Sequence, residues 1–207
     1  MVSSPKKTYY ITEVNYPVEI LMEELGLMEV RSELDADIIV YPGGPDLSPD
    51  IFGMDTHVDT LNYTPDRDLA EMAIFDNSKE SQLHIGICRG AQMLNLLCGG
   101  SLFQDVDNHT KARHWTLDVL THEFHLLNSR HHQTMIPGEE AEVLAVANAS
   151  TRMSTCYTQY EPEEDSWCDV EALCYSNRNV FCFQGHPEDC EDTEKYFKEL
   201  LKRKGFI

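Results

Sequence analysis

Leu83-His84-Ile85-Gly86-Ile87-Cys88-Arg89-Gly90-Ala91 is the stretch of sequence that decides the fold. Residues 83–87 form a short apolar run that predicts a buried strand, and residues 91–98 have the pattern of the start of a helix. Cys88 lies at the junction, with one glycine two positions before it and another two positions after it. Glycine alone tolerates the close packing of a strand that turns directly into a helix, so this spacing predicts a sharp turn that presents a nucleophile.

Two features of this turn favour a reactive thiol at Cys88. The positive end of the following helix dipole stabilises a thiolate, and the turn carries the sulfur clear of the sheet. A cysteine before a helix is more often a buried structural residue. The functional interpretation therefore requires a general base elsewhere in the chain.

A candidate base follows a second apolar strand, predicted over residues 180–183. Gln184-Gly185-His186-Pro187-Glu188 comes directly after this run, at the end of a strand, where parallel α/β sheets place their chemistry. Glu188 can turn back to the imidazole, hold its tautomer and stabilise the imidazolium that forms when the thiol loses its proton. We predict Cys88 as nucleophile, His186 as base and Glu188 as the orienting carboxylate.

An oxyanion hole is predicted after a third strand, residues 36–41. This strand runs into Pro42-Gly43-Gly44-Pro45-Asp46, and two glycines at such a place let backbone N–H groups face a developing negative charge. Gly44 is one candidate donor and the N–H of Arg89 is the second. The Arg89 side chain is also a candidate anchor for a substrate carboxylate, although its backbone N–H is the simpler assignment. A Gly-Gly-Pro segment taken alone indicates only a turn.

Together these residues resemble the class I glutamine amidotransferase superfamily, whose members use a Cys-His-Glu triad. The resemblance extends from about Asp37 to Glu188 and is strongest to the gamma-glutamyl hydrolase branch, which includes gamma-glutamyl-GABA hydrolase. Five ordered motifs at consistent spacing are more specific than any one of them. These motifs are residues 43–53, 86–105, 128–133, 170–172 and 183–188.

The resemblance implies a hydrolase that cleaves the γ-amide bond of glutamine or of a small γ-glutamyl compound through a γ-glutamyl thioester, without a cofactor. His131 belongs to the Asn-Ser-x-His-His-Gln segment, which borders the active site in the family, and is a candidate substrate-binding residue. Gln92, one turn into the nucleophile helix, and Asp46, in the first loop, are further candidates. A capping or packing role is the alternative for Gln92.

The chain departs from the pattern of this branch in three places. The part before Ala36 is short, which suggests that one βα unit is trimmed. The acidic stretch Tyr160–Trp167 is not part of the pattern, and Cys174 stands where the branch usually carries a glutamate. These departures leave the triad intact and bear on the substrate.

Two other functions remain open at this stage. The chain could be a glutaminase subunit that passes ammonia to a separate synthetase or amidoligase, with the acidic surface as a docking face. It could also be a non-catalytic binding module that kept the fold, although an intact Cys88, His186 and Glu188 argue against this.

Composition indicates a single cytoplasmic domain over residues 1–207. The chain can bury a substantial core, has no apolar run of membrane length, and carries no signal-peptide pattern in Met1–Lys7. Its seven cysteines are odd in number and lack a C-x-x-C pair, so we expect reduced thiols. The 36 acidic and 16 basic residues give a formal charge of −20, which argues against nucleic acid, anionic membranes and long polyglutamate chains as partners.

Six histidines crowd into one part of the chain and raise the question of a metal. No H-E-x-x-H spacing is present, and cysteine-hydrolase chemistry needs no metal. We therefore expect surface or satisfied core positions for most of them and no metal site. The six are His109, His114, His122, His125, His131 and His132.

The alternation of strands and helices predicts a three-layer α/β sandwich with a mostly parallel central sheet, similar to flavodoxin, and a β-rich second half. A helix is expected to begin at Thr64 or Pro65 and to turn Leu69, Met72 and Ala73 inward. The last helix is expected to begin near Asp192 or Thr193. Its predicted buried residues are Tyr196, Phe197, Leu200 and Leu201.

Overall fold

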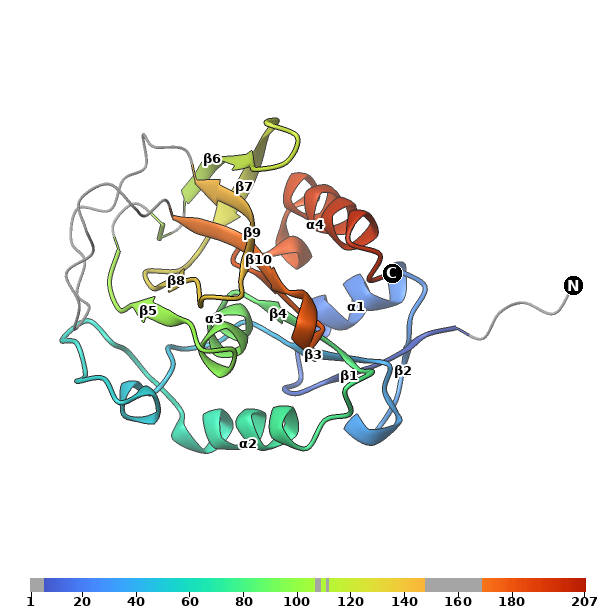
Figure 1. Ribbon diagram of the computed structural model, residues 1–207, viewed down its shortest axis with the longest axis horizontal. Coiled ribbons are helices and arrows are strands. Elements are labelled where there is room, and N and C mark those ends of the chain that lie inside the picture. The colour runs from blue at the N-terminus through green and yellow to red at the C-terminus, as the bar shows by residue number, and fades with distance from the viewer. Residues whose placement is uncertain (1–5, 107–108, 111, 148–168) are drawn as a thin grey trace, which may run out of the picture.

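The apolar runs of the sequence form the strands of one mixed sheet (Figure 1). The computed structural model describes residues 6–106, 109–110, 112–147 and 169–207, and the acidic stretch Tyr160–Trp167 lies outside the described residues. Among the described residues the strand order is β2-β1-β3-β4-β11-β10-β9-β6-β7, and β5 joins β10 through β8. The strands are β1 (Thr8–Ile11), β2 (Met28–Glu29), β3 (Ile38–Tyr41), β4 (Leu83–Ile87), β5 (Ser101–Phe103), β6 (Ala112–Asp118), β7 (Phe124–Ser129), β8 (Thr134–Ile136), β9 (Glu142–Ala147), β10 (Val170–Tyr175) and β11 (Val180–Phe183).

The two halves of the sheet differ in strand direction. Strands β2, β1, β3, β4 and β11 pair in parallel, whereas β10, β9, β6 and β7 continue the sheet in antiparallel pairs. The parallel centre and the β-rich second half confirm the predicted fold class, while the sheet as a whole is mixed.

Helices cover both faces of the parallel half. Helices α1 and α4 lie on one face and α2 and α3 on the other, which gives the three layers (Figure 1). The helices are α1 (Tyr16–Glu24), α2 (Pro65–Asp76), α3 (Arg89–Leu97) and α4 (Glu191–Arg203), with 3-10 turns η1 (Glu33–Asp35), η2 (Pro49–Phe52), η4 (Ser176–Arg178) and η5 (Pro187–Asp189). No helix in the described ranges is both long enough and apolar enough to cross a membrane.

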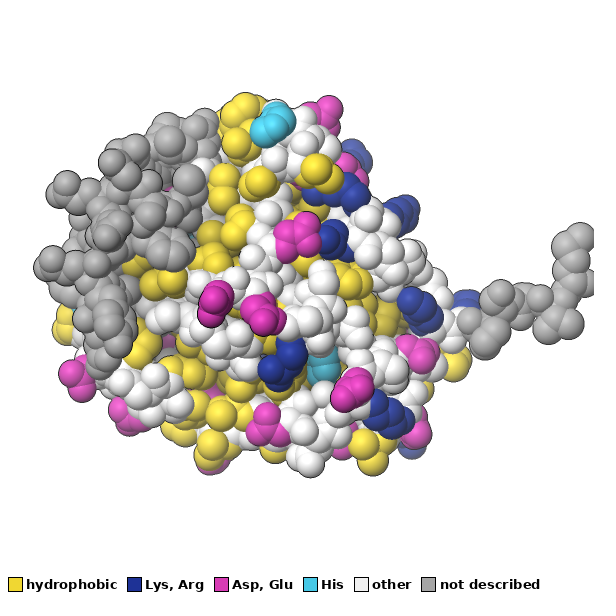
Figure 2. Space-filling view, viewed as in Figure 1, with side chains coloured by type: hydrophobic (Ala, Val, Ile, Leu, Met, Phe, Trp, Pro, Cys, Tyr) yellow, Lys and Arg dark blue, Asp and Glu magenta, His cyan; other side chains and the backbone are white. Residues whose placement is uncertain are grey.

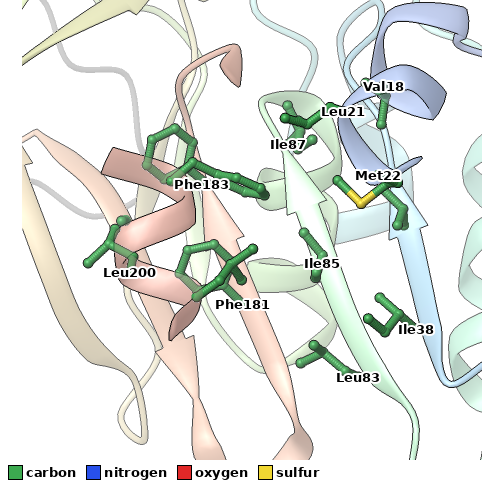
Figure 3. Close-up of a cluster of buried hydrophobic side chains, with 14 of the residues drawn as sticks. Val18, Leu21, Met22, Ile38, Leu83, Ile85, Ile87, Phe181, Phe183 and Leu200 are labelled. Atoms are coloured by element: carbon green, nitrogen blue, oxygen red, sulfur yellow. The ribbon is translucent and has the colours of Figure 1, made fainter. Parts of the chain in front are cut away.

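The central strands are apolar on both faces because each face is covered. In β3, Ile38 and Val40 pack into the core beneath α1 and α4, whereas Ile39 and Tyr41 pack into the core beneath α2 and α3. This continuous burial is typical of parallel strands covered by helices on both sides. Figure 3 shows the first core, where strand residues meet residues of α1 and α4. It labels Val18, Leu21, Met22, Ile38, Leu83, Ile85, Ile87, Phe181, Phe183 and Leu200.

Helix α4 follows its prediction closely. It begins at Glu191, one residue before the expected start, and Gly205 after its end has a φ of 71°. The four residues predicted to face inward are buried: Tyr196, Phe197, Leu200 and Leu201. Apolar spacing therefore placed this helix correctly, because all four of these side chains belong to the apolar core beneath α4.

The inward face of α2 differs from the prediction. The helix begins at Pro65 after Thr64, as expected, but Leu69 is 56% exposed. Asp68, Glu71 and Phe75 are the buried residues of this helix. Apolar periodicity failed here because α2 turns two carboxylates inward to meet a buried arginine, described below.

Acidic side chains are scattered over the face of the molecule drawn in Figure 2 rather than gathered into one patch. The described cysteines are all free thiols, in agreement with the expectation of reduced cysteines. They are Cys88, Cys98, Cys174, Cys182 and Cys190.

The sheet brings three loops to one edge. Strands β3, β4 and β11 are neighbours in parallel, with Tyr41 paired to Gly86 and Phe183 paired to Ile87. The chain after the last residue of each strand therefore emerges at the same edge, as expected for the carboxyl ends of parallel strands. The candidate active site lies there.

Candidate active site

Cys88 occupies a strained turn between β4 and α3. Its φ of 52° and ψ of −111° are rare for a residue with a side chain. A Cβ atom on Gly90 would collide with the carbonyl oxygen of Tyr41, and one on Gly86 would lie 2.5 Å from the backbone nitrogen of Ala91. The two glycines are thus required by packing, and they force the cysteine between them into the conformation of a nucleophile elbow.

His186 and Glu188 follow β11 on the neighbouring loop. The Nδ1 atom of His186 lies 2.8 Å from Oε1 of Glu188, and both side chains are largely buried. Burial lowers the pKa of His186, but the Cys88 thiol and the Glu188 carboxylate outweigh burial and raise this pKa to about 10. The imidazole is therefore prepared to hold a proton taken from the cysteine.

Asn128, which the sequence did not single out as an individual residue, fixes the loop that carries His186. Its side-chain Nδ2 donates to the carbonyl oxygen of His186, and its Oδ1 accepts from the backbone N–H of His186, both at 3.0 Å. This two-point contact determines where the imidazole lies. Asn128 belongs to the Asn-Ser-x-His-His-Gln segment, so the motif was visible in the sequence, although this contact was not.

The predicted oxyanion loop faces the cysteine. A Cβ atom on Gly43 would lie 3.0 Å from Cε1 of His186 and 3.6 Å from Cβ of Cys88, so this loop closes directly over the pair. Gly44 and Arg89 both line the small pocket that contains Cys88. The N–H groups of these two residues stay the predicted donors to a negative oxygen formed beside the sulfur.

Arg67 holds the oxyanion loop from the rear. Its Nη2 atom donates to the carbonyl oxygen of Pro42 at 3.0 Å, and both terminal nitrogens approach the carbonyl oxygen of Gly43 at 3.4 Å. A Cβ atom on Gly44 would collide with the same guanidinium. These contacts satisfy the two carbonyl oxygens and fix the backbone of the loop.

The Arg89 side chain is not a carboxylate anchor for a substrate. It is 1% exposed, and its guanidinium donates to Asp68 and Glu71 of α2. The expectation that this side chain could reach a substrate is therefore wrong, because the two buried carboxylates already occupy it. The backbone N–H of Arg89 stays a predicted oxyanion donor.

The three candidate substrate-binding residues all line the pocket around Cys88, whose volume is about 40 Å³. Gln92 donates from Nε2 to the carbonyl oxygen of Gln133 at 2.8 Å, so its side chain is partly engaged in holding the pocket wall. Nδ1 of His131 lies 2.8 Å from the same oxygen, and burial lowers the pKa of His131 to about 3. His131 is accordingly a neutral wall residue. Asp46, the third candidate, is bound by a histidine from across the pocket.

That histidine is His132, a pocket residue to which the sequence assigned no role. Its Nε2 lies 3.0 Å from Oδ2 of Asp46 and its Nδ1 lies 3.1 Å from Oδ1 of Asp105. The hydrogen bond to Asp46 is the main cause that raises the pKa of His132, against burial, to about 9. Two carboxylates on one ring require both nitrogens to donate, so His132 is an imidazolium that ties two loops together.

We expect His132→Gln to remove a pH-dependent part of the free energy of unfolding. The folded-state pKa of about 9 lies above the ordinary value of 6.5, so the contribution is complete below pH 6.5 and is lost as the pH rises through about 9. Below pH 6.5 we expect the free energy of unfolding of the wild type to be about 1–2 kcal/mol higher than that of the variant, after allowance for solvent screening. Above pH 9 we expect the two values to be nearly equal.

Urea unfolding over this pH range measures the difference. Asp46→Asn is the matched change, since Asp46 is the main cause of the raised pKa of His132. This variant should lose most of the same pH dependence of the free energy of unfolding. A constant difference between wild type and His132→Gln at every pH would contradict the assignment.

A larger cavity of about 610 Å³ adjoins the His186 loop. Arg130 lines both this cavity and the pocket around Cys88. Its side chain pairs with Asp189 at 2.5 Å and remains half exposed. The cavity residues are Thr110, Arg113, Asn128, Ser129, Arg130, Asp189 and Cys190.

Comparison with known proteins places this site in a family. The sequence model of peptidase C26 matches residues 17–188. A Lactococcus lactis protein described as glutamine amidotransferase-like is 27% identical over 186 residues, which cover 80% of this chain and 72% of that protein. A Mycobacterium tuberculosis protein named as a candidate glutamine amidotransferase is 34% identical over 177 residues, which cover 79% of this chain and 54% of that protein. The chain thus spans about half to three quarters of these relatives.

Solved structures show the same fold. A protein of Thermoplasma acidophilum, described as a candidate component of GMP synthase, aligns with a TM-score of 0.61 at 15% identity, and the alignment covers 96% of this chain and 99% of that one. A glutamine amidotransferase of Thermotoga maritima aligns with a TM-score of 0.60 at 14% identity, and the alignment covers 98% of this chain and 86% of that one. At these identities the likeness establishes the architecture.

Proposed function

The chain belongs to the peptidase C26 family of the class I glutamine amidotransferase-like superfamily, and on this premise we propose that it is a cysteine-dependent γ-glutamyl hydrolase. The single observation that carries the proposal is the cluster at the sheet edge. A strained Cys88 lies beside a His186 whose pKa is raised, and Glu188 holds the other ring nitrogen at 2.8 Å. Such a cluster provides a nucleophile, a base and an orienting group.

In the proposed reaction, His186 takes the proton of Cys88 and the sulfur attacks the γ-carbonyl carbon of the substrate. The oxygen becomes negatively charged and is stabilised by the N–H groups of Gly44 and Arg89. His186 then protonates the nitrogen of the leaving amine as the carbon–nitrogen bond breaks. Water, deprotonated by His186, cleaves the γ-glutamyl thioester and restores the thiol.

The gamma-glutamyl hydrolase branch is the more specific part of the proposal. Its support is the wall formed by His131, His132 and Gln133, which lines the pocket around Cys88 and belongs to the Asn-Ser-x-His-His-Gln segment. The cavity beside the His186 loop adds space for a leaving amine larger than ammonia, since the pocket itself is only about 40 Å³. On this view one domain, residues 1–207, releases the amine to solvent.

The second candidate function is a glutaminase subunit that supplies ammonia to a separate synthetase or amidoligase. The names of the relatives favour it, because both are described with reference to glutamine amidotransferases. The chemistry at Cys88 would be the same, and only the fate of the nitrogen would differ.

An assay of the purified chain separates the two functions. We expect release of glutamate from γ-glutamyl amines without any partner protein, faster than from glutamine, and none from the matching α-glutamyl amides. Mass spectrometry of acid-quenched enzyme should find a γ-glutamyl adduct on Cys88 and not on Cys98, which is the matched thiol at the other end of α3. Glutamine hydrolysis that requires a second protein would favour the glutaminase subunit, and labelling of Cys88 no faster than Cys98 would favour a non-catalytic module.

A further inference from the structure

A cluster of ionisable side chains is buried behind the pocket wall. His109 and Glu171 are 0% exposed and His114 is 3% exposed. Nε2 of His114 lies 2.9 Å from Oε1 of Glu171, and Nε2 of His109 lies 3.6 Å from the same oxygen. The cluster joins distant segments, because His114 belongs to β6 and Glu171 to β10.

The two strands that carry His114 and Glu171 are separated in the sheet order by β9, whose Ala147 pairs with Thr116 of β6. The His114 ring nonetheless reaches the Glu171 carboxylate.

The contact between His114 and Glu171 is close, but it is not aligned as a hydrogen bond. Neither carboxylate oxygen of Glu171 and neither ring nitrogen of His114 makes a hydrogen bond of acceptable geometry with any part of the chain that the structure describes. A buried carboxylate that lacks aligned donors destabilises the folded chain. Donor atoms that are close but misaligned are what a shared cation between them would produce.

The distances fit tetrahedral coordination. Zinc binds imidazole nitrogen and carboxylate oxygen at about 2.0–2.2 Å, so the edges of a tetrahedral site are roughly 3.3 Å long. The contacts of His114 and His109 with Glu171, 2.9 and 3.6 Å, bracket this length. Oδ2 of Asp169 lies 3.6 Å from Nε2 of His109, but it stands outside the group of atoms that are mutually close. Atoms of His109, His114 and Glu171 all lie within 4.8 Å of one another.

We propose that His109, His114 and Glu171 bind one divalent transition-metal ion, for which Zn²⁺ is the best match. Two imidazoles with a carboxylate are a donor set that zinc accepts, whereas calcium and magnesium prefer oxygen alone. This proposal departs from our expectation that the histidines occupy surface or satisfied core positions, and it does not depend on the proposed hydrolase activity.

The position of the site indicates a structural role. The ring of His131, which lines the pocket around Cys88, packs against His109 with ring centroids 4.9 Å apart. The carbonyl oxygen of Glu171 accepts the backbone N–H of Gln184, two residues before His186. The metal would thus fix the wall and the base loop from behind, with no contact to the reacting atoms.

Metal binding to the full-length chain tests the proposal. The protein, stripped with a chelator and dialysed, is titrated with Zn²⁺ and with Co²⁺, whose visible absorption reports tetrahedral coordination. We expect one Zn²⁺ per chain, displacement of Co²⁺ by Zn²⁺, and a rise of the thermal midpoint of about 5–10 °C at a hundredfold excess of free Zn²⁺ over Kd. A wild-type chain that binds no Zn²⁺ and gives no tetrahedral Co²⁺ spectrum overturns the proposal without any variant.

Variants locate the ion. Glu171→Gln and, separately, His114→Asn should lower Zn²⁺ affinity by roughly a hundredfold or more. His122→Asn is the matched control, because His122 is exposed in the same part of the chain and its φ of 59° is one that asparagine tolerates. Undiminished binding by both cluster variants, or loss of binding in His122→Asn alone, contradicts the site.

Discussion

Cys88→Ala should lower turnover of a γ-glutamyl substrate by about 10⁴-fold or more, and Cys88→Ser should behave similarly. Without the sulfur no thioester can form, and a serine hydroxyl is a much weaker nucleophile beside the same imidazole. We expect the free energy of unfolding of Cys88→Ala to stay within about 1 kcal/mol of wild type, because alanine keeps the Cβ atom in the same strained turn. Product release and urea unfolding measure the two effects.

The strain at this position gives the prediction a second readout. Cys88→Gly, equally inactive, should be more stable than Cys88→Ala by about 1 kcal/mol, since glycine adopts a φ of 52° without steric cost. Cys98→Ala is the control for general loss of a thiol and should retain activity. A Cys88→Ala protein with wild-type turnover would end the proposed mechanism.

Arg89→Met should destabilise the folded chain by about 3–5 kcal/mol. Methionine fills much of the volume of the arginine stem, so the principal loss is the charge between Asp68 and Glu71. These carboxylates are 0% and 1% exposed, and each receives a hydrogen bond from the Arg89 guanidinium. Without the guanidinium they would remain buried with much of their charge uncompensated, which is the costly outcome of breaking a buried ion pair.

Urea unfolding with two companion variants tests the origin of this effect. Arg31→Met removes an exposed arginine and should change the free energy of unfolding by less than about 0.5 kcal/mol. Adding Asp68→Asn and Glu71→Gln to Arg89→Met should recover part of the loss, because the buried charges then disappear together. Equal stability of Arg89→Met and Arg31→Met would show that the buried pair contributes nothing.

Some of the site could be predicted because local spacing dictates it. The glycines on either side of Cys88 are required by contacts within a few residues of the turn and with the adjacent β3, so the elbow was visible in six letters of sequence. His186 and Glu188 are two residues apart, and their contact at 2.8 Å is equally local. Their meeting with Cys88 follows from the parallel pairing of β4 with β11.

Other parts could not be predicted because they depend on which charges are buried together. The inward face of α2 is set by the contacts of its carboxylates with Arg89 and not by apolar spacing. Leu69 therefore faces solvent, whereas Asp68 is buried. The raised pKa of His132 depends on its contact with Asp46, which lies 86 positions away in the sequence. Apolar periodicity contains no information about such partners.

The sequence by itself determined the elbow at Cys88, the strands that carry the site and the class of chemistry that a Cys-His-Glu set supports. These depend on short-range sterics and on apolar runs, which a single sequence displays directly. Tertiary structure alone decided that the Arg89 side chain is occupied, that Asn128 fixes the loop of His186, and that His109, His114 and Glu171 meet behind the pocket. The physical reason is that a buried charge takes its role from the partner that folding brings to it, and that partner can come from anywhere in the chain.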